Sequence, residues 1–363
     1  MHLQAEVLVL RGDIAESRHR VQCVLADDAG RMRAATALPE TVTSFRSAAK
    51  PFQLLPFVER GHADALHCSE AELAIMAASH SGSRAHLDLV RGLLARLGLD
   101  AGHLACGYHD PQDPQSLADV RRDPSSCDAL YNNCSGKHTG MLAFCRAEGW
   151  PVEGYERAEH PLQQLMLRTV AECCAVTAES VVSGIDGCGV PVFGLPLRRM
   201  AQGYARIAVA MAATPASLSA TAPDAQRTRA LGRIGRAMSA HPVVVEGAGR
   251  LATDLMLATG GRVLAKSGAE GLLLVAEPAR GLGVAIKCED GAMRALGPVC
   301  VELLSTLGVL QAAEVAQLAG HRRTPVSNAA GREVGWLEGR VTAQAAAPAA
   351  AGSTAGPAGD VRA

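Results

Sequence analysis

Ser47 and Lys50 stand three positions apart directly before Pro51, and the proline constrains how this stretch can fold. Proline has no amide hydrogen for a helical bond, and it moves the residue before it away from helical backbone angles. We therefore predict a tight turn over residues 46–50. A helix should follow it, with Pro51 in its first turn, and should end near residue 60 at a glycine.

The chemistry of this turn makes both side chains candidates for catalysis. A three-residue spacing on a helical turn brings two side chains to one face, with Cβ atoms roughly 5–6 Å apart. A serine hydroxyl becomes a good nucleophile when a base removes its proton, and a desolvated lysine can be that base. The same Ser-x-x-Lys pattern also fits an ordinary helix start with a solvated lysine. The pattern alone leaves both interpretations open.

Composition excludes several other classes of protein. The chain has 363 residues, 48% of them hydrophobic, and 35 basic residues against 36 acidic ones. This balance provides no field that would attract nucleic acid or a membrane surface. The apolar run near the N-terminus is too short for a secretory signal, and an odd number of cysteines, eleven, argues against a disulfide framework. We expect a cytoplasmic protein with reduced thiols that binds neither nucleic acid nor a membrane.

The order of apolar runs and turn signals predicts an α+β fold with an antiparallel sheet flanked by helices. Strands are predicted near both chain ends, at residues 5–10, 20–26, 261–266, 272–276 and 284–287. Helices are predicted mainly in the middle, at residues 73–78, 86–97, 139–147, 161–174, 197–212, 225–240 and 292–307.

The remaining segments set the domain organisation. Residues 106–128 are rich in turn signals and are predicted to form a long loop. Residues 1–340 should form one catalytic unit, with a sheet lobe from both chain ends and a helical lobe from the middle. Residues 341–363 are almost entirely Ala, Gly, Pro, Thr and Ser and are predicted to be a disordered tail.

Ser79 and Lys266 are further candidates for the chemistry of the turn. Ser69 and Glu72 form a capping box that begins a helix, and Ser79 follows at the end of that helix. Lys266 stands at a predicted strand end before Ser-Gly, where it could face a cleft. Two lysines near one serine would lower each other's pKa and so favour a neutral amine. A helix stop and a lysine at a strand end are the ordinary alternatives.

Cys134, Lys137 and Cys188 lie in two polar, glycine-rich stretches and suggest a metal site. Cysteine thiolates are the ligands that zinc favours. The chain has no C-x-x-C pair, so spacing alone leaves these cysteines open to being ordinary thiols.

Taken together, four motifs resemble the rhizobial-type, or class 3, L-asparaginases, whose fold is similar to that of serine β-lactamases and penicillin-binding proteins. The resemblance runs from about residue 5 to residue 340. The motifs are Ser47-Ala48-Ala49-Lys50-Pro51-Phe52-Gln53, Asn133-Cys134-Ser135-Gly136-Lys137-His138, Asp186-Gly187-Cys188-Gly189 and Lys266-Ser267-Gly268-Ala269-Glu270-Gly271.

The resemblance implies roles for the residues of these motifs. It implies two Ser–Lys tandems, Ser47 with Lys50 and Ser79 with Lys266. It also implies a zinc ion that is held by Cys134, Lys137, Cys188 and water. We further expect a homodimer. The positions implied to bind substrate are Arg46, Asn133, His138 and Asp186.

From these residues we expect hydrolysis of L-asparagine to L-aspartate and ammonia, with Ser47 as nucleophile, Lys50 as its base, and Ser79 and Lys266 assisting. The assignment of the nucleophile to Ser47 rather than Ser79 is left open. The alternatives are a hydrolase of β-lactams or other amides with the same fold, and a zinc-binding protein without catalytic activity.

Overall fold

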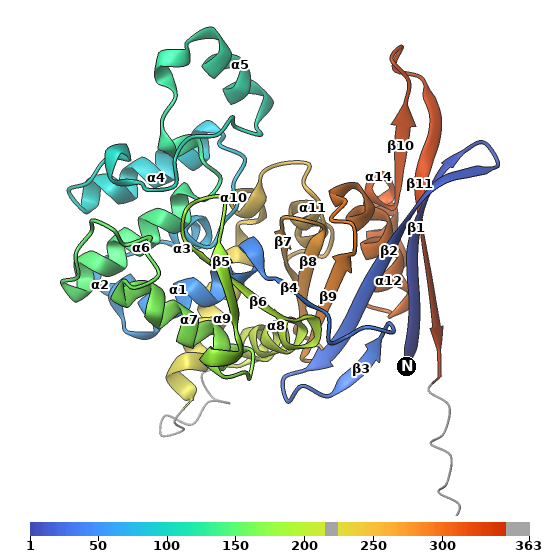
Figure 1. The fold of residues 1–363 in the computed structure, drawn as a ribbon, viewed down its shortest axis with the longest axis horizontal. Helices are drawn as coiled ribbons and strands as arrows, with labels where there is room; N and C mark the ends of the chain where they lie inside the picture. Colours follow the sequence, from blue (N-terminus) through green and yellow to red (C-terminus); the bar gives the residue numbers. More distant parts are fainter. Residues whose placement is uncertain (215–223, 346–363) are drawn as a thin grey trace, which may run out of the picture.

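The computed structural model describes residues 1–214 and 224–345 (Figure 1). Within them, eight strands from both chain ends form one large sheet, in the order β10-β11-β1-β3-β2-β9-β8-β7. Neighbouring strands are antiparallel except for one short parallel contact between β1 and β3. The strands are β1 His2–Arg11, β2 Ile14–Asp27, β3 Met32–Ala35, β7 Leu264–Gly268, β8 Leu272–Glu277, β9 Leu282–Cys288, β10 Arg323–Ser327 and β11 Glu333–Gln344.

A smaller sheet of three described strands lies between the large sheet and the helices in Figure 1, in the order β4-β6-β5. Its strands are β4 Val42–Ser44, β5 Val182–Ile185 and β6 Pro191–Pro196. The stretch that carries Ser47 leaves this sheet directly after β4. The small sheet therefore fixes where that stretch begins.

Many of the helices gather on the left in Figure 1, away from the large sheet, while others pack against that sheet. Helix α8 packs against β2, β8 and β9, while α12 packs against β1 and β11. The described helices are α1 Lys50–Glu59, α2 His62–Ala65, α3 Glu70–Met76, α4 Arg84–Arg96, α5 Pro114–Arg122, α6 Ser135–Glu148, α7 Pro161–Cys173, α8 Leu197–Ala212, α9 Ala225–Ala240, α10 Pro242–Glu246, α11 Leu251–Ala258, α12 Leu296–Thr306, α13 Ala312–Gln317 and α14 Ala319–Arg322. This architecture confirms the predicted α+β class. None of the described helices is long and apolar enough to span a membrane.

Most predicted elements appear within a few residues of their expected bounds, and three differ for physical reasons. The predicted loop 106–128 contains α5, because Asp113 caps its first turn and Pro114 occupies its first position. Helix α6 begins at Ser135, four residues early, because polar motif residues themselves form its first turn. Strand β7 begins at Leu264, because positive φ angles at the two preceding glycines make a turn there.

Of the predicted tail, residues 341–363, the structure describes only residues 341–345. Val341 pairs with Ala5 and Gln344 with His2, so β11 continues past residue 340. Residues 346–363 lie outside the described residues. The division into one catalytic unit of two lobes stays a prediction.

Candidate active site

Buried aromatic side chains pack next to the turn that precedes α1. Residues 46–49 form a short 3-10 helix, and α1 follows with Pro51 in its first turn, as predicted. Lys50 itself keeps helical angles, with φ of −58° and ψ of −37°, so the expected departure from helical geometry before the proline is wrong. Phe45, Phe52 and Tyr204 are fully buried and pack on one another, and the Tyr204 hydroxyl donates to the carbonyl of Ala48 at 2.9 Å. These contacts fasten the turn that carries Ser47 to the core.

Arg46 has a strained backbone directly before Ser47. Its φ of 45° lies in the left-handed region, which costs a non-glycine residue about 1–2 kcal/mol. The Arg46 guanidinium is held by an ion pair with Asp186, with 2.9 Å between Nε and Oδ1. The pair joins the Ser47 turn to the glycine-rich turn that follows β5, so two of the predicted substrate-binding positions lie together.

The Lys50 side chain contacts residues from other parts of the candidate site. Its side chain is buried, and its Nζ donates to the carbonyl of Ala78 at 2.5 Å and to the Ser79 hydroxyl at 2.9 Å. Burial lowers the pKa of the Lys50 amine, and the charges of Lys137 and Lys266 lower it further, while Cys134 raises it. The Lys50 amine, within hydrogen-bonding distance of a serine, therefore gives up its proton more readily than an ordinary lysine.

Lys266 meets a carboxylate that sequence reasoning missed. It is fully buried on β7, and its Nζ forms an ion pair with Glu246 at 2.8 Å and donates to the carbonyl of Ser267 at 2.9 Å. The resemblance pairs Ser79 with Lys266, whereas the hydrogen bond to Ser79 comes from Lys50. Lys266 is thus fixed as one half of an ion pair.

The first turn of α6 brings Cys134 and Lys137 to Cys188. The Lys137 Nζ donates to the Cys188 sulfur at 2.9 Å, and the Cys188 thiol donates to Cys134, which also accepts a hydrogen bond from Lys50. A glycine permits this arrangement, because a Cβ on Gly136 would lie 2.2 Å from the carbonyl oxygen of Ile75 in α3. The close approach of α6 and α3 places the cysteine motif beside the segment that carries Ser79.

The two cysteine thiols differ in acidity. The hydrogen bond from Cys188, with the Lys50 and Lys137 charges, lowers the pKa of Cys134 well below its usual value despite burial. The same hydrogen bond, together with burial, raises the pKa of Cys188. Although burial opposes its charge, the two sulfurs raise the pKa of Lys137. Two sulfurs and an amine in one buried cluster fit a soft metal such as zinc by their chemistry.

A second group of metal-ligating side chains lies elsewhere in the described residues. The ligand atoms of His19, Cys288 and Asp290 all lie within 4.8 Å of one another. Asp290 already bonds the other two, to His19 Nδ1 at 2.6 Å and Cys288 Sγ at 2.9 Å, and Arg294 Nε donates to His19 Nε2 at 3.1 Å. A guanidinium on the ring nitrogen opposes a bound cation, so we keep Cys134, Lys137 and Cys188 as the predicted zinc ligands.

His138 and Asn133, the other two predicted substrate-binding residues, contact different neighbours. His138 is fully buried, and its Nδ1 lies 2.6 Å from the Tyr155 hydroxyl, while its Nε2 has no hydrogen-bond partner among the described residues. Burial lowers the pKa of His138 well below its usual value, so the ring is neutral. The backbone amide of Asn133 donates to His109 Nε2 at 2.8 Å. The His138 Nε2 is thus a buried polar atom whose hydrogen-bonding capacity the described residues leave unused.

The scarcity of lysine could have identified part of this site from the sequence. The chain contains only four lysines, Lys50, Lys137, Lys266 and Lys287, among its 35 basic residues. Three of the four are buried in the candidate site, although lysine is a residue that proteins rarely bury. Glu246 carries no such signal, because it stands outside the four motifs.

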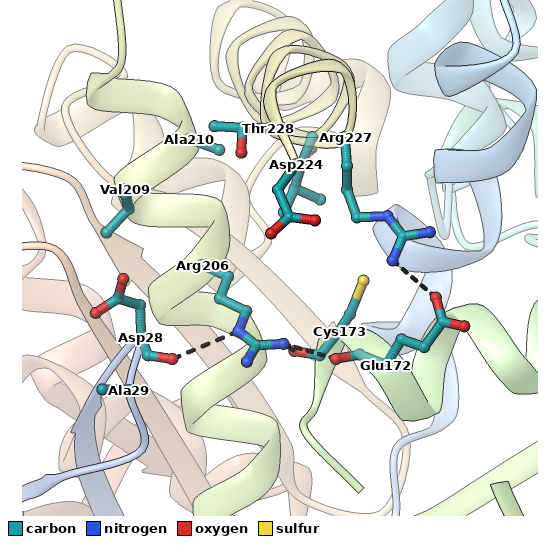
Figure 2. Close-up of a pocket in the computed structure, with 11 residues that line it drawn as sticks. Asp28, Ala29, Glu172, Cys173, Arg206, Val209, Ala210, Asp224, Arg227 and Thr228 are labelled. Atoms are coloured by element: carbon teal, nitrogen blue, oxygen red, sulfur yellow. Dashed lines mark hydrogen bonds and ion pairs between the residues drawn. The ribbon is translucent and has the colours of Figure 1, made fainter. Parts of the chain in front are cut away.

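A cavity of about 420 Å³ lies apart from these residues, between α7, α8 and α9 (Figure 2). Its two arginines are already engaged. Arg206 donates to the carbonyl oxygens of Asp28, Glu172 and Cys173, and Arg227 bonds the carboxylates of Glu59 and Glu172. We assign these charges to joining the helices rather than to a ligand.

Comparison with known proteins identifies the family. The family model for L-asparaginase II matches residues 7–339. A comparison with curated protein sequences finds no match. Similar solved structures include Mglu, crystallised in its native form in the presence of 4.3 M NaCl, and the LovD6 mutant of simvastatin synthase (LovD) from Aspergillus terreus.

Both structural similarities are distant. Mglu is 16% identical with a TM-score of 0.35; the match covers 83% of this chain, which spans 64% of the length of Mglu. LovD6 is 15% identical with a TM-score of 0.33, over 82% of this chain and 90% of LovD6. Similarity of this degree carries no argument about the site. The family match, in contrast, covers most of the chain and confirms the resemblance given by the four motifs: the chain belongs to the L-asparaginase II family of amidohydrolases.

Proposed function

We propose that the protein is an L-asparaginase that hydrolyses L-asparagine to L-aspartate and ammonia. The observation that carries the proposal is the buried Lys50 amine, which is hydrogen-bonded to Ser79 and stands one turn after Ser47 in a member of this family. A neutral lysine beside a serine is the pairing that an acyl-enzyme mechanism needs.

In the proposed reaction, Ser47 attacks the side-chain amide carbon and Lys50 accepts the serine proton, directly or through the Ser79 hydroxyl. The tetrahedral intermediate collapses as the amide nitrogen takes a proton and leaves as ammonia. Water then attacks the acyl-enzyme and releases aspartate. Lys266 supplies positive charge where the oxyanion develops, which stabilises the transition state.

The proposed substrate contacts suit a small zwitterion. The guanidinium of Arg46 can bind a carboxylate, and Asp186, its partner at 2.9 Å, can bind an ammonium group. Asn133 and the free nitrogen of His138 would contact the remaining polar groups. A bulky, mostly apolar β-lactam matches this charged set less well, so we place the lactam hydrolase second.

Cys134, Lys137 and Cys188 would hold a zinc ion beside Lys50. When bound, the ion would supply positive charge that orients the substrate and would tie the two polar turns together. The serine already provides the nucleophile, so the proposed steps need no metal-bound water. We also propose a homodimer, on the family resemblance alone, and the molar mass in solution by light scattering tests it.

Ammonia release from asparagine and glutamine, with and without a chelator, tests the proposed function. We expect ammonia from asparagine and none from a Ser47→Ala control. Turnover of the β-lactam nitrocefin without ammonia release would replace the proposal by the lactam hydrolase. Metal binding without either activity would favour the protein that only binds zinc.

A further inference from the structure

Glu246 is a buried carboxylate at the end of α10, and its bonds converge on one oxygen. Its side chain is only 4% exposed, and its Oε1 accepts hydrogen bonds from Lys266 Nζ at 2.8 Å, the Ser267 amide at 2.8 Å and the Ser267 hydroxyl at 2.5 Å. Burial opposes ionisation of this carboxyl, but the Lys266 charge and these hydrogen bonds outweigh burial and lower its pKa. Glu246 and Lys266 therefore form a charged pair inside the protein.

The residues on either side of Glu246 contact the segment that carries Ser79. The carbonyl of Val245 accepts a hydrogen bond from the Ser79 amide at 2.8 Å. Gly247 has a φ of 104°, and a Cβ at this position would lie 2.5 Å from the Ser81 hydroxyl oxygen. Three consecutive residues thus contact both the Ser79 segment and the start of the Lys266-Ser267-Gly268 motif. The spacing between these two parts of the site depends on this tripeptide.

We propose that Glu246 is a positioning residue for the reaction, which holds Lys266 as a fixed ammonium group facing the site defined by Ser79 and Lys50. The inference rests on the proposed function, because it assigns Lys266 its role in that reaction. Bound to this carboxylate, the Lys266 amine is fixed in position. Lys50, which donates to the Ser79 hydroxyl, is then the amine placed to exchange a proton with a serine.

The energetics of buried pairs give this proposal a specific signature. Removing one partner of a buried ion pair leaves an uncompensated charge, which is more disruptive than removing both. When two residues act as a unit, the loss of activity in the double variant is also smaller than the product of the losses in the two single variants. Glu246→Gln keeps an oxygen acceptor for Ser267 but removes the charge, so it tests the charge specifically.

The experiment measures kcat and KM for asparagine in Glu246→Gln, Lys266→Met and the double variant. We expect each single variant to lose on the order of 10²-fold in kcat/KM, mainly in kcat. The kcat/KM of the double variant should be no lower than that of the less active single variant. Glu246→Asp, which keeps the charge, should recover part of the rate. Losses that multiply to about 10⁴-fold in the double variant would overturn the proposal.

Glu277→Gln is the matched control. Glu277 is also buried and ion-paired, to Arg280 at 3.0 Å, but it lies at the β8–β9 turn. Its replacement removes a buried charge outside the site and should leave kcat unchanged. A loss of kcat as large as that of Glu246→Gln would show a general effect of buried charge and would overturn the specific role.

A second measurement needs no substrate. Because the chain has four lysines, protein labelled with [ε-13C]lysine should give four resolvable signals, each assigned by its variant. Glu246→Gln should move the Lys266 signal and leave that of Lys287 in place; an unmoved Lys266 signal would overturn the proposal. Failure of the proposed function is distinct, because the wild-type protein would then release no ammonia.

Discussion

Burial of one amine is the residue-scale feature on which the proposed chemistry depends. Lys50 loses its contact with solvent, and its pKa falls because burial disfavours the charged form and because Lys137 and Lys266 add positive charge nearby. The base form dominates above this lowered pKa, so kcat/KM for asparagine should rise with pH through it. The rising limb should lie below the ordinary lysine value of about 10.4.

The Lys266→Met variant tests the electrostatic part of this account. It removes one of the cations that lower the pKa of Lys50, so its rising limb should shift to higher pH, in addition to any loss of rate. Methionine retains most of the side-chain stem, which limits repacking. A pH profile of kcat/KM with an unmoved limb would mean that the two lysines are not electrostatically coupled.

Ser47 is the proposed nucleophile, so its replacement should remove activity. Ser47→Ala removes only a hydroxyl from a half-buried position and should lower kcat by on the order of 10³-fold or more without loss of stability. Ser44→Ala is the control, because the Ser44 hydroxyl is buried nearby on β4 and has no hydrogen-bond partner among the residues that the structure describes. If Ser47→Ala stays active and Ser79→Ala does not, the nucleophile is Ser79.

At the scale of elements, helix α3 positions the Ser79 segment, and its start was predictable. Ser69 accepts a hydrogen bond from the Glu72 amide, while the Glu72 carboxylate accepts one from the Ser69 amide, which forms the predicted capping box. Ser69→Ala should lower the free energy of unfolding by about 1 kcal/mol. Urea unfolding measures this change, and an unchanged transition midpoint would contradict it. We expect kcat to stay constant, because Ser69 lies outside the site.

The two turns that hold Cys134 and Cys188 give a prediction about metal content. The purified protein should contain about one zinc per chain, and Cys134→Ala with Cys188→Ala should abolish it, since two of the three protein ligands are lost. Elemental analysis measures the content. A Cys288→Ala variant is the control for the cluster with His19 and Asp290. If zinc is lost from this control and retained in the double variant, the zinc site is the cluster of His19, Cys288 and Asp290.

Local sequence signals predicted elements well and contacts between elements only in part. The proline after Lys50, the capping box and the apolar runs of β8 and β9 act within a few residues, so the sequence displays them. The contact of Lys50 with Ser79, 29 positions away, and that of Lys266 with Glu246, 20 positions away, depend on how helices pack on the sheet. The family motifs brought most site residues together, but they did not include Glu246.

At the scale of the whole molecule, the two chain ends close one sheet. β1 lies between β11 and β3 and also pairs with β2, so the N-terminal strands join the C-terminal strands in a single surface. The site residues come from well-separated parts of the chain, among them α1, α6 and β7. Because they meet only when the sheet and the helices are assembled, loss of global stability should remove the site as a unit.

The pH dependence of this global stability follows from buried histidines. His80 and His138 are fully buried, and burial lowers the pKa of both well below the usual value, while burial also lowers that of His86. These rings stay neutral in the folded chain but take up protons on unfolding below about pH 6.5. The stability that they contribute is therefore complete above that pH and is lost as the pH falls.

For each proton that only the unfolded chain binds, the free energy of unfolding falls by about 1.4 kcal/mol for every unit by which the pH is lowered. Urea unfolding at pH 7.5, 6.5 and 5.5 should therefore show a decline that steepens below about pH 6.5. His80→Gln should make the decline shallower, whatever its effect on stability at pH 7.5, because glutamine does not titrate. A free energy of unfolding that stays constant from pH 7.5 to 5.5 would show that these rings are protonated as easily in the folded chain as in the unfolded one. The core around His80, His86 and His138 would then have to be open to water.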